Sequence, residues 1–139
     1  MKKKVRDKIE ANRQQVNAML QQQLTQEPHR NFSRYFEENG IHTVAVYGAG
    51  AVGRELVRQL KNTVGVEYLI DKFACEDSVE GVPVLSQVLH FLPEVDAVII
   101  TPCHELDFIV YEIRNFYTDD CRLIGLNELL ERTGAGNEA

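Results

Sequence analysis

Three glycines between residues 48 and 53 are spaced as in a turn that binds phosphate groups. Gly48, Gly50 and Gly53 form a GxGxxG sequence between the apolar run at 43–47 and a helical pattern. The first glycine permits a tight turn, the second leaves room for a diphosphate beside the backbone, and the third lets the helix pack closely on the strand. Amides of the first helical turn then face the ligand with the positive end of the helix dipole. The predicted diphosphate site comprises Gly48, Ala49, Gly50, Ala51, Val52 and Gly53.

Asp71 follows Gly53 by 18 residues and ends the next apolar run, at 66–70. An acidic residue in this position accepts hydrogen bonds from ribose hydroxyls, and its charge repels a 2′-phosphate, so NAD is favoured over NADP. The alternative is that Asp71 begins a turn with Lys72. Lys72 is also included in the predicted cofactor site.

Thr101 and Pro102 follow the apolar run at 97–101, beside the expected switch point of an open parallel sheet, where ligands bind. Thr101 is predicted to cap the next helix, with Pro102 in its first turn. Both residues are added to the predicted cofactor site. Arg54, in the first turn of the helix after the glycines, either reaches a phosphate or faces solvent beside Glu55 and Arg58.

Cys103 and His104 raise the alternative of nucleophilic catalysis. Adjacent helical side chains point about 100 degrees apart, and no third group that would orient the histidine is apparent. No catalytic residue is therefore predicted. The cysteines, Cys75, Cys103 and Cys121, are odd in number and lack CxxC spacing, which indicates reduced thiols, and no metal site is predicted.

Short apolar runs that alternate with helical patterns predict an α/β fold with an open, mainly parallel, Rossmann-like sheet of about five strands. The strands are expected at 43–47, 66–70, 82–85, 97–101 and 122–124, and the helices at 51–61, 86–91, 104–117 and 127–131. The expected strand order is 3-2-1-4-5, with 43–47 central because both of its faces are apolar. Residues 71–81 leave little room for a crossover helix, so 82–85 is expected to be a short or irregular edge strand.

Residues 1–40 are predicted to be an N-terminal helical extension, residues 41–132 the nucleotide-binding domain, and residues 133–139 a disordered tail. Residues 5–24 have a narrow apolar stripe, and a second short helix with Phe32, Tyr35 and Phe36 on one face ends at Asn39-Gly40. The first helix either packs beside the sheet or forms a homodimer contact.

The chain has 139 residues, enough for one domain, and a net charge of −6. That charge argues against nucleic-acid binding, because phosphate backbones are bound by concentrated cationic surfaces. No apolar run is long enough for a membrane span or a signal peptide, so the protein is expected to be cytoplasmic and not membrane-bound.

From about residue 40 to 132 the chain resembles the small Rossmann domains of bacterial surface-polysaccharide and nucleotide-sugar proteins, including the N-terminal domains of sugar acyltransferases. The matching segments are VAVYGAGAVGREL at 44–56, YLID at 68–71, GVPVLS at 81–86, DAVIITP at 96–102 and LIGLNELL at 123–130. The resemblance implies that Gly48 to Gly53 hold the diphosphate and that Asp71 holds the base or ribose. The left-handed helix that carries out acyl transfer is absent from this sequence, so the resemblance does not imply that reaction.

The sequence therefore predicts a stand-alone module that binds a small-molecule nucleotide, NAD or a nucleotide-diphosphate sugar, linked to surface-polysaccharide metabolism. One alternative is a component of an NAD-dependent oxidoreductase or epimerase whose substrate site comes from another subunit, because little chain follows the fifth strand to build one. Another is a domain that keeps the fold and binds nothing.

Overall fold

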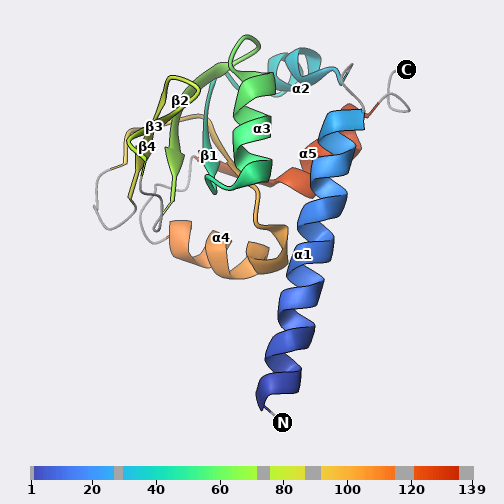
Figure 1. Cartoon of the computed structure of the whole chain (residues 1–139). Helices are drawn as coiled ribbons and strands as arrows, with labels where there is room; N and C mark the ends of the chain where they lie inside the picture. The colour runs from blue at the N-terminus through green and yellow to red at the C-terminus, as the bar shows by residue number, and fades with distance from the viewer. Residues whose placement is uncertain (1, 27–29, 72–75, 87–91, 115–120, 135–139) are drawn as a thin grey trace.

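The computed structural model describes residues 2–26, 30–71, 76–86, 92–114 and 121–134, which form an α/β structure around one mostly parallel six-stranded sheet (Figure 1). The strand order is β3-β4-β2-β1-β5-β6. The strands are β1 (Thr43–Tyr47), β2 (Gly65–Ile70), β3 (Ser78–Val79), β4 (Val82–Leu85), β5 (Ala97–Ile100) and β6 (Arg122–Gly125). The predicted order of the five expected strands is confirmed, and a sixth strand is added at one edge.

Strand β1 lies in the centre of the sheet because both of its faces are apolar. It pairs in parallel with β2 on one side and β5 on the other. Val44 and Val46 belong to the core on one face, whereas Ala45 and Tyr47 belong to the core on the opposite face. A strand that buries side chains on both faces needs a neighbouring strand on each side and helices above and below.

The prediction that residues 82–85 form the edge of the sheet is wrong. Strand β4 lies between β2 and β3, and the two-residue β3 forms the edge as the antiparallel partner of β4. The turn between them contains Glu80 and Gly81, with φ angles of +53° and +80°. Two successive positive φ angles match the right-handed twist of a tight hairpin, so a Glu-Gly pair between two valines was the overlooked signal.

Five α-helices and one 3₁₀ helix are described: α1 (Lys2–Gln26), α2 (Phe32–Glu38), α3 (Ala51–Leu60), η1 (Cys103–Glu105), α4 (Leu106–Arg114) and α5 (Leu126–Thr133). Helices α1, α2, α3 and α5 contribute to the core on one face of the sheet, and α4 covers the other. The helix predicted at 104–117 begins only at Leu106. The residues before it form the 3₁₀ turn η1, in which the Pro102 carbonyl accepts a hydrogen bond from the Glu105 amide. Residues 87–91 of the helix predicted at 86–91 lie outside the described residues, and Ser86 is not helical.

Helix α5 is longer than predicted at both ends, and the predicted tail begins too early. Thr133 is its last residue, is 3% exposed and donates its hydroxyl hydrogen to the Leu129 carbonyl at 2.6 Å. A buried threonine with its hydroxyl satisfied by the preceding turn belongs to the folded domain. Residues 135–139 lie outside the described residues.

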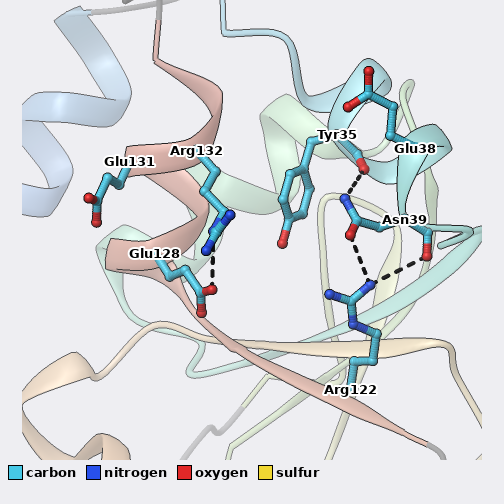
Figure 2. A pocket seen from close by; sticks show the side chains of 7 residues that line it. All are labelled: Tyr35, Glu38, Asn39, Arg122, Glu128, Glu131 and Arg132. Atoms are coloured by element: carbon cyan, nitrogen blue, oxygen red, sulfur yellow. Dashed lines mark hydrogen bonds and ion pairs between the residues drawn. The ribbon is translucent and has the colours of Figure 1, made fainter. Parts of the chain in front are cut away.

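Polar contacts hold the end of α2 beside β6. Gly40 ends the helix with a φ of +67°, and the Ile41 amide donates to the Phe36 carbonyl at 2.8 Å, as expected for a glycine cap. Arg122 at the start of β6 donates to the Asn39 side-chain oxygen at 3.2 Å (Figure 2). The two segments are far apart in the sequence, so these contacts fix the extension against the sheet.

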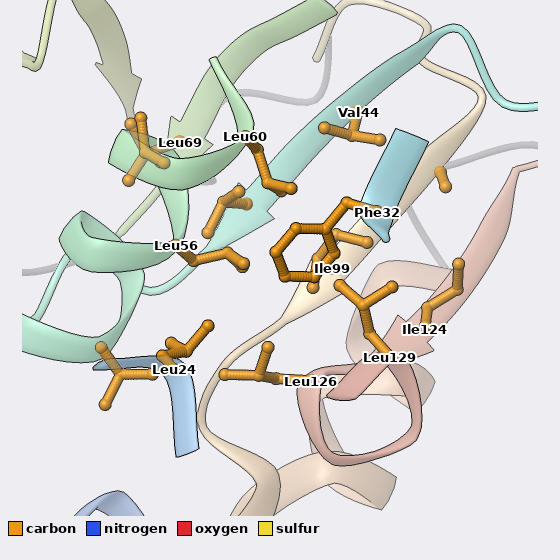
Figure 3. Packing of buried hydrophobic residues seen from close by; sticks show 14 of the residues in the cluster. Leu24, Phe32, Val44, Leu56, Leu60, Leu69, Ile99, Ile124, Leu126 and Leu129 are labelled. Atoms are coloured by element: carbon orange, nitrogen blue, oxygen red, sulfur yellow. The ribbon is translucent and has the colours of Figure 1, made fainter. Parts of the chain in front are cut away.

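The two N-terminal helices share the main core with the sheet (Figure 3). Leu24 of α1 and Phe32 of α2 lie in one apolar cluster with Leu56, Ile99 and Leu129. Leu20 and Leu24 are at most 1% exposed. The second half of α1 therefore packs beside the sheet, as one of the two alternatives for this helix predicts.

Replacing Leu24 with alanine is expected to destabilise the whole domain. A Leu→Ala change at a fully buried site costs about 2–5 kcal/mol through lost transfer free energy and the cavity that remains. The control is Met19→Ala on the same helix, where the side chain is 51% exposed and the cost should stay within about 0.5 kcal/mol. Urea unfolding followed by circular dichroism measures both values. Equal values for the two variants would mean that α1 does not belong to the cooperative core.

Candidate functional site

The GxGxxG turn connects the carboxyl end of β1 to α3, and its first glycine is required by geometry. Gly48 has a φ of +104°, which side chains of L-amino acids rarely adopt. A Cβ atom at this position would overlap the Thr101 hydroxyl and press on the Pro102 ring. The Gly48 amide donates to the Ile70 carbonyl at 2.8 Å, which ties the turn to β2.

The other two glycines differ in what surrounds them. A Cβ atom on Gly53 would overlap the carbonyl oxygen of Gly48, so α3 can approach β1 this closely only with glycine at 53. Gly50 precedes the first residue of α3, has ordinary extended backbone angles and has no atom within 4 Å of a would-be Cβ. The helix has no side-chain cap at this position. Gly50 thus leaves the N-terminus of α3 open on one side, as the GxGxxG pattern predicts.

Asp71 lies directly beside the turn, where the sequence predicts it. Its carboxylate oxygen Oδ2 accepts a hydrogen bond from the Ala49 amide at 2.8 Å. The acidic group therefore anchors the turn in addition to any role toward a ligand. Lys72, the next predicted site residue, lies outside the described residues.

Arg54 crosses the outside of the turn. Its Nε donates to the Ala49 carbonyl at 2.9 Å, and its Nη2 donates to Oε1 of Glu76 at 2.6 Å. The Glu76 carboxylate holds the pKa of Arg54 above its ordinary value. Arg54 is exposed, as one of the two alternatives predicts, but its partner is Glu76, and Glu55 and Arg58 pair with each other. No local pattern identified Glu76, which reaches Arg54 only in the folded chain.

Thr101 packs against Gly48 of the turn and does not cap a helix. Its side chain is buried, and its hydroxyl donates to the Tyr47 carbonyl at 2.8 Å. Pro102, predicted in the first helical turn, instead immediately precedes η1 and carries no capping side chain. The predicted capping role is therefore wrong, since the hydroxyl is already used between two neighbouring strands. Pro102 lies against Gly48, so both residues are still next to the turn.

A hollow of about 670 Å³ follows Pro102 along η1 and the start of α4, and it is lined by residues 103–108. The His104 side chain is only 9% exposed, and neither ring nitrogen has a hydrogen-bond partner among the described residues. Its Nε2 is 3.8 Å from Oε1 of Glu105. This hollow brings an imidazole and carboxylates to the carboxyl edge of the sheet.

Cys103 is not arranged as a nucleophile activated by His104. The Cys103 sulfur lies 3.5 Å from the side-chain oxygen of Asn127 and 3.6 Å from the Ile100 carbonyl, at hydrogen-bonding distance. Burial raises the pKa of the Cys103 thiol, which favours the protonated and less reactive form. Cys103 and His104 lie together without forming a hydrogen-bonded pair among the described residues.

The carboxyl edge of the sheet is acidic around Tyr47. Burial raises the pKa of the Tyr47 phenol to about 12, and the charges of Glu112, Asp71 and Glu105 act in the same direction. The phenol therefore remains protonated at neutral pH. Asp71 beside the turn and Glu105 in the hollow therefore both act on the same phenol.

A second hollow, of about 630 Å³, lies between α2, α5 and β6 (Figure 2). It is lined by Tyr35, Glu38, Asn39, Arg122, Glu128, Glu131 and Arg132. Arg132 forms an ion pair with Glu128 at 3.2 Å, and Arg122 donates to the Asn39 side-chain oxygen at 3.2 Å. Because Arg122 begins β6, this hollow is at the amino edge of the sheet, opposite the glycine turn. Sequence reasoning did not find it, since three separate segments supply its lining.

The described residues contain no cluster of three or more metal-binding side chains and no helix of the length and apolarity that a membrane crossing requires. No protein-family model matches the chain, and neither the curated proteins nor the solved structures include a significant match. The resemblance to Rossmann domains of polysaccharide proteins therefore stays a prediction from sequence.

The three glycines are expected to differ sharply in their tolerance of alanine. Gly48→Ala and Gly53→Ala should each lower the free energy of unfolding by about 1–3 kcal/mol or more, because the new methyl group overlaps neighbouring atoms. Gly50→Ala should leave it unchanged or raise it by about 0.5 kcal/mol, since the backbone is already compatible with alanine. Chemical denaturation of the three variants measures this. A Gly50 variant as unstable as the other two would contradict the open geometry.

Proposed function

We propose that this chain is a Rossmann-type nucleotide-binding module that holds the diphosphate of NAD or of a nucleotide-diphosphate sugar at the β1–α3 turn. The observation that carries the proposal is the open approach to the N-terminus of α3 at Gly50, with Asp71 beside it. Backbone amides at such a helix start attract a phosphate through hydrogen bonds and the helix dipole. The turn therefore needs no lysine side chain to bind a phosphate.

Asp71 can anchor the turn and bind a ribose at the same time. Its bond to Ala49 uses one oxygen, and a carboxylate has two oxygens that each accept more than one hydrogen bond. Ribose hydroxyls are donors that suit this acceptor. Glu105 and Glu112, the other acidic groups around Tyr47, are further hydrogen-bond acceptors along the carboxyl edge. They favour a ligand that is rich in hydroxyl groups.

Arg54 offers a cation to the diphosphate at low cost. Its partner Glu76 is on the surface, with side-chain exposures of 45% for Arg54 and 49% for Glu76. Exposed ion pairs contribute little to stability, so the guanidinium group can exchange this partner for a phosphate oxygen. The exchange would bring a charge-assisted contact to the outer side of the turn.

The hollow beside residues 103–108 is the natural place for the group attached to the diphosphate. Pro102 touches Gly48, and His104 follows only two residues later, so at most about 7.6 Å separates the Pro102 and His104 Cα atoms. Glu105 and Asp107 supply acceptors for the hydroxyls of a sugar or of the nicotinamide ribose. NAD and a nucleotide-diphosphate sugar both carry hydroxyl groups that match these acceptors, and ligand-binding measurements distinguish the two.

We infer binding without turnover by the chain alone. The Cys103 thiol faces Asn127, and no described group orients His104. The alternative is a component of an oxidoreductase or epimerase that receives its substrate site from another subunit. The link to surface-polysaccharide metabolism rests on sequence resemblance, and the cytoplasm remains the location that the sequence predicts.

The binding site is tested by Gly50→Val. In thermal unfolding of the wild type with NAD, a uridine-diphosphate sugar or coenzyme A, a ligand at about one hundred times its Kd should stabilise the fold by about 2.7 kcal/mol. The valine side chain would fill the approach to α3 and abolish this gain, while the variant itself stays folded. Ala18→Val, at an exposed site on α1, is the matched control and should bind normally. No stabilisation of the wild type by any of the three nucleotides would count against the proposal.

The ribose contact is tested by Asp71→Asn. The asparagine oxygen can still accept from the Ala49 amide, so the turn is retained while the charge is removed. Hydrogen bonds to charged groups contribute about 1.5–3 kcal/mol, so affinity for NAD should fall by about tenfold or more. Affinity for NADP should fall less, because repulsion of its 2′-phosphate is relieved. Calorimetry that finds an unchanged NAD to NADP affinity ratio would exclude this role for Asp71.

A further inference from the structure

Half of the longest helix lies away from the rest of the chain. Helix α1 packs into the core through Leu20 and Leu24, with Val16 against them, but its N-terminal part runs past α4 and leaves the body of the molecule (Figure 1). The sequence places Val5 and Ile9 at the same helical spacing as this buried row. The spacing of this row therefore continues into the part of α1 that leaves the body of the molecule (Figure 1).

The segment 2–13 of α1 has a charge distribution that is unfavourable for an isolated helix. It contains six basic and two acidic residues, a net charge of +4, and the first turn has no acidic residue. Cations at a helix N-terminus oppose the helix dipole, and an isolated helical segment of about 12 residues is marginal in water. The whole chain has a net charge of −6, which leaves −10 on the remaining residues. Contact with an acidic surface would offset the positive charge at the helix N-terminus and would stabilise a segment that is marginal as an isolated helix.

Helix α4 presents such a surface. Phe108 is 62% exposed and Tyr111 is 72% exposed, and their spacing of three residues places both rings on one side of the helix. Two exposed acidic residues precede them in the sequence, Glu105 at the end of η1 and Asp107 in the first turn of α4. The charged groups on η1 and α4 are His104, Glu105, Asp107, Glu112 and Arg114, with an excess of negative charge. Two exposed aromatic rings with acidic neighbours are typical of a contact surface for a basic amphipathic helix.

We propose that two copies of this chain associate with segment 2–13 of each lying on α4 of the other. A two-fold dimer needs one surface that contains both members of a complementary pair, and this chain carries the basic helix and the acidic aromatic face together. This inference does not rest on nucleotide binding. Because the proposed function also assigns Glu105 and Asp107 to the ligand, the partner helix and the ligand would compete for these two carboxylates.

Sedimentation velocity of the full chain tests the aromatic part of the surface. The wild type should be a dimer at micromolar concentration. The double variant Phe108→Ser, Tyr111→Ser should weaken the dimer by at least about tenfold, since exposed aromatic anchors dominate such contacts. Both side chains are largely exposed, so circular dichroism should remain that of the wild type. Met19→Ser removes an apolar side chain that is 51% exposed on the packed half of α1 and should leave the dimer intact.

A charge exchange tests the partner and the register. Lys3→Glu with Lys4→Glu, or Glu105→Lys with Asp107→Lys, should each weaken the dimer by about tenfold, and combining the four changes should restore it. Glu37→Lys, an exposed site on α2, which covers the face of the sheet opposite α4, is the control and should have no effect. The proposal is overturned by a monomeric wild type, by a dimer that ignores the aromatic variants, or by a failure of the combined charges to restore it. A monomer that binds anionic lipid vesicles through the lysines would identify a membrane surface as the occupant and equally overturn the proposal.

Discussion

The close approach of α3 to β1 is the constraint on which this carboxyl edge depends. The Gly48 carbonyl lies against Gly53, and the Thr101 hydroxyl occupies the space where a side chain on Gly48 would be. The same hydroxyl is bound to the Tyr47 carbonyl, so β1, β5 and α3 meet at one tightly packed point. Because interiors resist even small changes in volume, a methyl group here would displace the helix start. The position of the helix N-terminus is therefore a consequence of packing and exists before any ligand arrives.

The sheet makes that packing possible by burying apolar side chains on both faces. Val46 and Ile99 face the cluster covered by α1, α2, α3 and α5, and Tyr47 and Ile100 face the cluster covered by α4. The N-terminal helices are part of this arrangement, since Leu24 and Phe32 lie in the first cluster. A complete core on each side keeps the strand ends in register, and the polar groups that follow those ends are thereby held along one edge.

Residues at the glycine turn have structural contacts as well as the chemistry of a binding site. Asp71 accepts from the Ala49 amide, and Arg54 bridges the Ala49 carbonyl and Glu76. These contacts fix the turn without closing it at Gly50. The proposed binding site would therefore be preorganised, because the backbone of the turn is already fixed and little conformational entropy would be lost on binding. Simple removal of Asp71 would disturb the turn, so its contact with Ala49 and its proposed contact with a ribose must be separated by a substitution that keeps the acceptor.

The sequence by itself determined the α/β class, the order of the five expected strands and the proximity of Asp71 to the glycine turn. These follow from local periodicity, since apolar residues on both faces mark a central strand and glycine spacing marks a strand-to-helix turn. Only the tertiary structure decided that Thr101 bonds to Tyr47 and that Arg54 reaches Glu76. The exposure of Phe108 and Tyr111 on α4 was equally invisible in the sequence. Each of these depends on side chains far apart along the chain, and their positions are set by the packing of whole helices on the sheet, which no local pattern contains.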